Sequence, residues 1–161
     1  MRSALILLAV LVLSSCGSPA PADRQMAGAV SVHDQWASAG DGRMAAVFGT
    51  LVNAGPREAR IVSGSSPAAG MVEVHEVTGP TGAKTMRPKD GGLVLPPGGS
   101  HDLVPGGDHL MLMDLPAPLS AGTDVELTLQ FEDGSTLPIT VQVRDFAGAD
   151  ENYRPDHGSH G

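Results

Sequence analysis

Glycine and proline interrupt this sequence so often that, beyond the first residues, apolar side chains occur only in short runs. The 161 residues include 21 glycines and 13 prolines, and only 3% are aromatic. Between these breaks the apolar residues alternate with polar ones. They do not recur with the sustained period of 3.6 residues that would indicate a helix. We therefore predict an all-β domain of about seven to nine short strands, folded as an antiparallel β-sandwich.

The strands are expected where alternating segments end at turn residues. Pro67 and the Gly-Pro-Thr-Gly segment at 79–82 mark two such ends, and Asp133-Gly134 is the turn pair of a hairpin. The expected strand segments are Met44–Asn53, Arg60–Ser66, Met71–Val77, three short runs within Gly91–Met113, and the hairpin Asp124–Val143. Because the chain is too short for two comfortable domains, this succession predicts one folded domain at residues 30–146.

The N-terminus has the pattern of an export signal. Arg2 precedes the apolar run Ala4–Leu13, which is too short to span a membrane. The next residues, Leu-Ser-Ser-Cys at 13–16, resemble a bacterial lipobox. This resemblance implies a signal peptide at residues 1–15, removal before Cys16, acyl chains on that cysteine and export to the outer side of a cell membrane. The alternative is an ordinary secretory signal followed by a chance cysteine.

Residues on either side of the expected domain are polar or rich in small residues. The segment 16–29 indicates a flexible tether, and the tail 147–161 is expected to be disordered. Lipidation of the only cysteine would leave the domain without a disulfide or a thiolate metal ligand. The formal net charge of −8 argues against a nucleic-acid partner, and we expect a monomer.

Histidine and methionine occur together in strand-like segments. In the segment 109–113, alternation places His109, Met111 and Met113 on one face and two leucines on the other. His75 lies in another predicted strand, and Met86 follows the turn after it. Thioether sulfur is a soft, neutral ligand that favours Cu(I), and imidazole also binds copper. The alternative is that the methionines fill the core and the histidines face solvent.

Several longer motifs match one known family. The segments "MVEVHEV", "MRP", "LPPGG", "HLML" and "PL..G..V.L.L.FE.G" resemble the periplasmic copper chaperones called PCu(A)C, over about residues 30–143. The resemblance implies a cupredoxin-like Greek-key β-sandwich without enzymatic activity. It implies Cu(I) bound by His75, Met86, His109 and Met111. It also implies copper delivery to the Cu(A) centre of cytochrome c oxidase subunit II, alone or with a Sco-type protein.

Other residues and functions remain open at this point. His157 and His160 could form a Cu(II) site in the tail or be incidental, and Met113 could be a reserve thioether, although packing is favoured for it. We expect His101 to face solvent and Trp36 to pack in the core. The alternative functions are a copper-sequestering resistance lipoprotein and a metal-free interaction sandwich. We find no Ser-His-Asp arrangement, phosphate loop or paired carboxylates that would indicate an enzyme.

Overall fold

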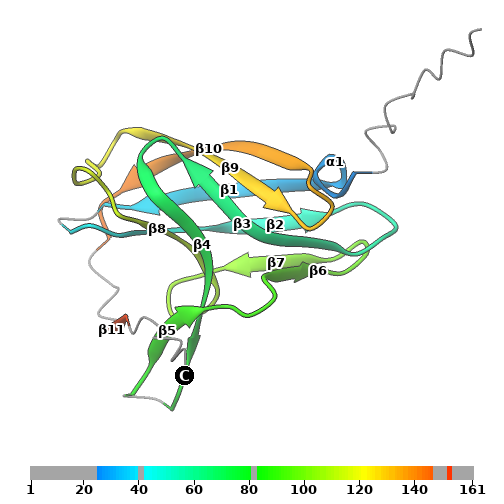
Figure 1. Cartoon of the computed structure of the whole chain (residues 1–161), viewed down its shortest axis with the longest axis horizontal. Coiled ribbons are helices and arrows are strands. Elements are labelled where there is room, and N and C mark those ends of the chain that lie inside the picture. The colour runs from blue at the N-terminus through cyan, green and yellow to red at the C-terminus, as the bar shows by residue number, and fades with distance from the viewer. Residues whose placement is uncertain (1–24, 40–41, 81–82, 147–151, 154–161) are drawn as a thin grey trace, which may run out of the picture.

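The computed structural model describes residues 25–39, 42–80, 83–146 and 152–153, and these residues form a β-rich domain (Figure 1). One short helix precedes the first strand. The elements are α1 (Met26–Ala29), β1 (Val30–Ser38), β2 (Ala45–Asn53), β3 (Ala59–Ser66), β4 (Ala69–Thr78), β5 (Thr85–Pro88), β6 (Leu93–Leu95), β7 (Ser100–Leu103), β8 (His109–Met113), β9 (Asp124–Phe131), β10 (Thr136–Arg144) and β11 (Asn152–Tyr153). The expected all-β class is confirmed.

The local sequence explains the hairpin of β9 and β10. In β9 every second side chain is buried, from Val125 to Phe131, which is the period of a strand with one face in the core. Gln130 pairs with Thr136 across the turn, and Gly134 in that turn has a φ of +80°, which glycine adopts without strain. The predicted hairpin and its turn pair are therefore present.

Seven strands close on themselves. Neighbouring pairs run from β4 through β8, β2, β1, β10, β9 and β3, and β3 pairs again with β4. Most of these pairs are antiparallel, but β1 and β10 are parallel, with Trp36 opposite Gln142. Because the ring is closed, each of its strands is hydrogen-bonded to a neighbour along both edges. Few open edges therefore remain for pairing with other chains.

The closed wall has apolar clusters on both of its faces. The larger cluster fills the interior and includes Val72 and Val74 from β4 and Leu110 and Leu112 from β8. A smaller cluster is centred on Ala46, Phe48, Met86 and Met111. Its members from β2 and β8 alternate along the strands with the residues that point into the interior, so they lie on the other face of the wall. The strands β8 and β2 therefore separate two distinct packed regions, and the second region contains two candidate metal ligands.

The ends of the chain lie partly outside the described residues. Cys16, the predicted signal peptide and most of the predicted tether fall there, and so do His157 and His160. Inside the tail that we expected to be disordered, Asn152 and Tyr153 form β11, which pairs in parallel with β5. No helix among the described residues is long and apolar enough to cross a membrane.

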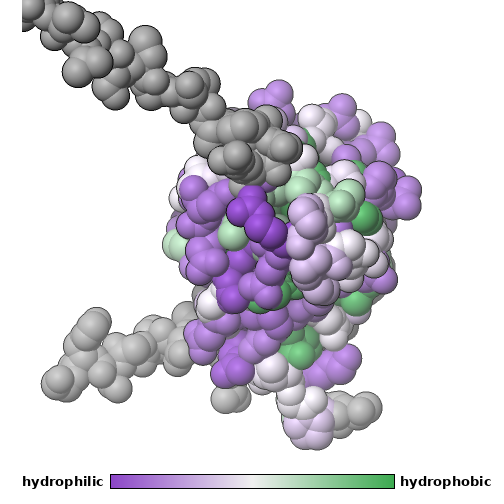
Figure 2. Space-filling view, turned by 90° about the vertical axis from the view of Figure 1, so that its right-hand side faces the viewer, coloured by the Kyte–Doolittle hydropathy of each residue, from purple (hydrophilic) through white to green (hydrophobic). Residues whose placement is uncertain are grey.

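One side of the molecule is mainly hydrophilic. Figure 2 shows the side that lies at the right of Figure 1, and apolar colour appears there only as small separate areas between polar residues. The part of this side that is visible in Figure 2 therefore shows no broad apolar surface among the described residues.

Candidate metal centre

The two candidate histidines lie directly opposite each other on neighbouring strands. The antiparallel register of β4 and β8 pairs His75 with His109, and their ring centroids are 5.8 Å apart. His75 is fully buried and His109 is 2% exposed. Two imidazoles that are 34 residues apart in sequence are thus neighbours because of strand register.

The β4–β5 hairpin brings Met86 to the same place. Val77 of β4 pairs with Met86 of β5, so Met86 shares a face with His75, two residues before Val77. The Sδ atom of Met86 lies 2.8 Å from Nε2 of His109. The turn after His75 therefore brings Met86 back beside the two histidines, as expected for a residue that follows that turn.

Met111 completes the group of four. It pairs with Glu73 of β4 on one side and with Ala46 of β2 on the other, two residues along β8 from His109. Met111 and Met86 are each 5% exposed and belong to the same cluster, and the half-buried Met113 packs against it. The alternation predicted for 109–113 is therefore correct, and the four candidate ligands gather on one buried face.

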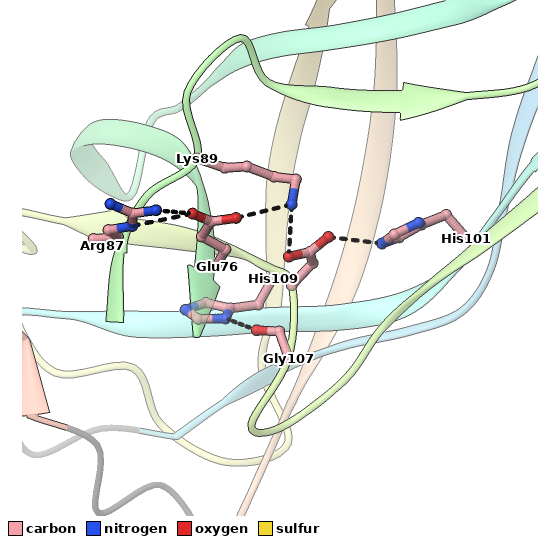
Figure 3. A network of polar contacts seen from close by, with 7 residues as sticks. Glu76, Arg87, Lys89, His101, Gly107 and His109 are labelled. Carbon is pink, nitrogen blue, oxygen red and sulfur yellow. Dashed lines mark hydrogen bonds and ion pairs between the residues drawn. The ribbon is translucent and has the colours of Figure 1, made fainter. Parts of the chain in front are cut away.

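Neighbouring oxygens orient both imidazoles. Nδ1 of His109 lies 2.9 Å from the carbonyl oxygen of Gly107 (Figure 3), and Nε2 of His75 lies 2.9 Å from a carboxylate oxygen of Glu73. Because these oxygens can only accept, the ring nitrogen beside each must carry the proton. In the neutral ring the lone pair then lies on Nε2 of His109 and Nδ1 of His75. Such partners fix the tautomer and raise the basicity of metal-binding histidines.

The contact between His109 and Met86 fits a soft cation. In the tautomer set by Gly107, Nε2 of His109 and Sδ of Met86 are both electron-pair donors, so neither supplies a proton to the other. Nitrogen and thioether donors without charge favour Cu(I) over harder ions. Among the described residues there is also no group of three or more His, Cys, Asp or Glu side chains that could hold a metal ion.

Aromatic rings cover one flank of the site. The ring of Phe48 lies 6.1 Å from that of His109 and 4.8 Å from that of Trp36, and Phe146 packs against Trp36 at 5.2 Å. Trp36 thus packs in the second cluster, which agrees with a packing role. An apolar flank excludes water and strengthens the interaction of a cation with its ligands.

An ion network links the segments that carry the candidate ligands (Figure 3). Glu76 accepts hydrogen bonds from Arg87 at 2.8 Å and from Lys89 at 3.1 Å. Lys89 also donates to Asp108 at 3.2 Å, and Asp108 pairs with His101 at 2.9 Å. Three of these residues are chain neighbours of candidate ligands: Glu76 follows His75, Arg87 follows Met86, and Asp108 precedes His109.

Sequence reasoning did not find this network. His101, which we expected to face solvent, is partly exposed and also pairs with Asp108. The sequence does show a charged residue next to each of three candidate ligands. Which of these charged residues pair with one another depends on the register between strands, which the sequence does not show. Because the network ties β4, β5 and the start of β8 together, it holds three candidate ligands at fixed separations.

The network also shifts the pKa values of its members. The hydrogen bond from Lys89 is the main cause that lowers the pKa of Glu76 below 4.5, and Arg87 adds to it. Burial alone would lower the pKa of Lys89, but its hydrogen bonds to Glu76 and Asp108 outweigh burial and raise the pKa above 10.5. Both shifts mean that the folded protein favours the charged forms at neutral pH.

Comparisons with known proteins place the chain in a defined group. The model of the family described as "Putative lipoprotein LpqE-like" matches residues 30–143. A relative from Leifsonia xyli subsp. xyli, named "Putative lipoprotein Lxx21020", is 40% identical over 158 residues, which cover 96% of this chain and 95% of the relative. An uncharacterized protein of Rickettsia prowazekii, RP573, is 29% identical over 98 residues, covering 61% of this chain and 54% of that protein.

Solved structures share the fold. The copper-bound PCuAC domain from PmoF2 has a TM-score of 0.62 at 24% identity and covers 74% of this chain and 96% of its own. The solution structure of the Cu(I) form of DR1885 from Deinococcus radiodurans has a TM-score of 0.53 at 29% identity, covering 78% of this chain and 87% of that one. The expected cupredoxin-like sandwich is thereby confirmed.

Removing the charge of Glu76 should destabilise the metal-free protein at neutral pH. We expect Glu76→Gln to lower the free energy of unfolding at pH 7 by about 1 kcal/mol, because the three charge-assisted hydrogen bonds from Arg87 and Lys89 weaken. A lowered pKa stabilises the folded state above pH 4.5, and this stabilisation is lost as the pH falls through the folded-state value. Urea unfolding should therefore show that the difference in the free energy of unfolding between the wild type and Glu76→Gln becomes smaller below pH 4.5.

Glu58→Gln is the matched control for this measurement. Glu58 pairs with Arg60 at 3.2 Å, but its side chain is 52% exposed, so the free energy should change little. An equal loss for both variants, or a Glu76→Gln effect that is constant from pH 7 to pH 3, would contradict the stabilising role of the network.

Proposed function

Because the chain belongs to the LpqE-like family of PCuAC-type proteins, we propose that it is an exported, lipid-anchored Cu(I) chaperone for the Cu(A) centre of cytochrome c oxidase. Membership confirms the PCu(A)C resemblance, and this family resembles copper chaperone domains rather than enzymes. The observation that carries the proposal is the gathering of His75, Met86, His109 and Met111 on one buried face.

Copper is the cargo in this proposal, and each ligand type has a role. The imidazoles of His75 and His109 provide nitrogen donors whose orientation is fixed by Glu73 and Gly107. The thioethers of Met86 and Met111 provide soft donors that keep their affinity for Cu(I) and reject harder ions. Methionine also forms no disulfide, so the site would keep its ligands in an oxidising compartment outside the cytoplasm.

The donors available in the domain favour a carrier over a blue-copper electron-transfer protein. The domain has no cysteine after residue 16, so the His₂Cys set of a blue-copper centre cannot form. All four ligands are at most 5% exposed, which protects Cu(I) from water and oxidants during transport. The acceptors proposed from the family resemblance are subunit II of the oxidase and a Sco-type protein, and the domain would act as a monomer.

The lipid anchor is part of the same proposal. The lipobox at 13–16 would place acyl chains on Cys16, and the descriptions of both the family and the Leifsonia relative contain the words "Putative lipoprotein". Two or three acyl chains give a stable attachment, whereas one gives only marginal binding. Attachment to the membrane would keep the carrier near a membrane-bound oxidase.

The first test concerns the thioethers. At free Cu(I) 100 times the Kd, binding should stabilise the wild-type protein by about 2.7 kcal/mol. We expect Met86→Leu combined with Met111→Leu to abolish most of this gain, because leucine keeps the packing volume but removes both sulfur donors. Anaerobic unfolding with and without Cu(I) measures the effect, and Met26→Leu, in helix α1, is the matched control. Equal copper stabilisation of the double variant and wild type would exclude the site.

The second test separates delivery from sequestration. We expect the Cu(I)-loaded protein to transfer its copper to the metal-free soluble domain of oxidase subunit II, with or without a Sco-type protein. Transfer is measured by separating the two proteins and determining the copper in each. Retention of all copper by this protein would favour the alternative of a resistance lipoprotein. Absence of any copper binding would favour a metal-free interaction sandwich.

The third test concerns the anchor. Cys16→Ser should abolish incorporation of radiolabelled fatty acid and move the protein from the membrane fraction to the soluble exported fraction, because the acylated thiol is lost. Ser15→Ala, which keeps a small residue before the cysteine, is the control and should be labelled normally. Membrane association that survives Cys16→Ser would contradict lipidation as the means of attachment.

A further inference from the structure

Methionine is unusually exposed at one end of the sheet face that carries the proposed copper site. Among the described residues, four large apolar side chains are exposed, and two of them are Met44 at 38% and Met71 at 42%. The other two are Val62 and Val104. Exposed thioethers gain little from packing, so burial does not explain the choice of methionine at these two positions.

Strand pairing places both exposed methionines beside Met113. Met71 of β4 is the direct cross-strand partner of Met113 in β8. On the other side of β8, Met44 immediately precedes Ala45, the residue that pairs with Leu112. The N–H group of Leu115 donates to the carbonyl oxygen of Arg43 at 3.0 Å, so the two chain segments stay adjacent beyond β2.

The same face continues directly into the proposed site. Met113 and Met111 are two residues apart on β8, and Met71 and Glu73 are two apart on β4. Side chains at this spacing share a face and are about 7 Å apart, while directly opposite Cβ atoms are about 5 Å apart. Met113 also packs against the cluster that contains Met111. Methionine has three rotatable side-chain bonds, which allow its sulfur to span these separations.

The buried site needs a connection to the outside. His75, His109, Met86 and Met111 are at most 5% exposed, so an acceptor protein cannot contact a copper ion that they hold. Met113 is half-buried, packs against the cluster that contains Met111 and pairs across the strands with Met71, whereas Met71 and Met44 reach the solvent. These three residues thus provide soft donors at graded depth beside the buried ligands.

We propose that Met44, Met71 and Met113 form a second, weaker Cu(I) site at the surface, through which copper enters and leaves the buried site. This inference rests on the proposed copper function. Three neutral thioethers are selective for Cu(I) but lack the imidazole donors of the buried site, so their affinity is lower. Copper remains Cu(I) throughout. On entry, the bond from copper to the sulfur of Met44 or Met71 breaks as the bond to Met113 forms. The bond to Met113 then breaks as the bond to Met111 forms, and release reverses these two steps.

The direct test follows the methionine methyl groups. The full chain is labelled with ¹³C at these methyls and titrated without oxygen with Cu(I), and in parallel with Ag(I), a soft cation of the same charge. We expect the first equivalent to shift Met86 and Met111, and the second to shift Met44, Met71 and Met113. A second equivalent that leaves these three methyls unmoved would overturn the surface site.

Two double variants separate this inference from the proposed function. Met44→Leu with Met71→Leu should lose the second set of shifts but keep the first. Its copper transfer to a chelator should slow about tenfold, corresponding to about 1.4 kcal/mol in the barrier. Met86→Leu with Met111→Leu should lose the first set and keep the second. If copper shifts only the methyl groups of Met44, Met71 and Met113 in the wild type, the buried site is rejected and the surface site is not.

Met26→Leu is again the matched control, because Met26 lies in helix α1 and belongs to neither set. It should leave both sets of shifts and the transfer rate as in the wild type. Transfer at the wild-type rate from the protein with Met44→Leu and Met71→Leu would overturn the proposed route.

Discussion

The antiparallel pairing of β4 with β8 is the constraint on which the rest of the site depends. A strand places successive side chains on opposite faces, so this one pair of strands sends Val72, Val74 and the leucines of β8 into the interior and its imidazoles to the other face. A slip of one residue would exchange the two sets and bury thioether and imidazole in the main core. The packing of the core therefore fixes the positions of His75 and His109.

Much of the fold could be predicted because its signals are local. Turn residues such as Asp133-Gly134 and the alternation in 109–113 are read within a few positions, and both led to the correct strands and faces. The parallel pairing of β1 with β10 could not be predicted in this way, because it joins segments about one hundred residues apart. The family resemblance supplied the candidate ligands, and the register explains how Met86, after a hairpin, reaches His109.

The parts of the site that sequence reasoning missed are those that depend on partners across strands. Lys89 is an ordinary charged residue in sequence, yet it joins Glu76 and Asp108 and so ties together segments with three candidate ligands. The same holds for the methionines at the surface, since Met71 and Met44 lie on either side of Met113 only after the sheet has formed. In these cases the sequence shows the residue types, but it does not show which residues become neighbours across the strands.

The aromatic flank gives the molecule an internal optical reporter. The chain has a single tryptophan, Trp36, and its ring contacts Phe48, which in turn lies beside the imidazole of His109. Emission from this indole therefore arises one side chain away from the candidate ligands and from nowhere else in the chain. Changes in the packing or charge around His109 can be followed by fluorescence in the unlabelled protein, without introducing a foreign dye.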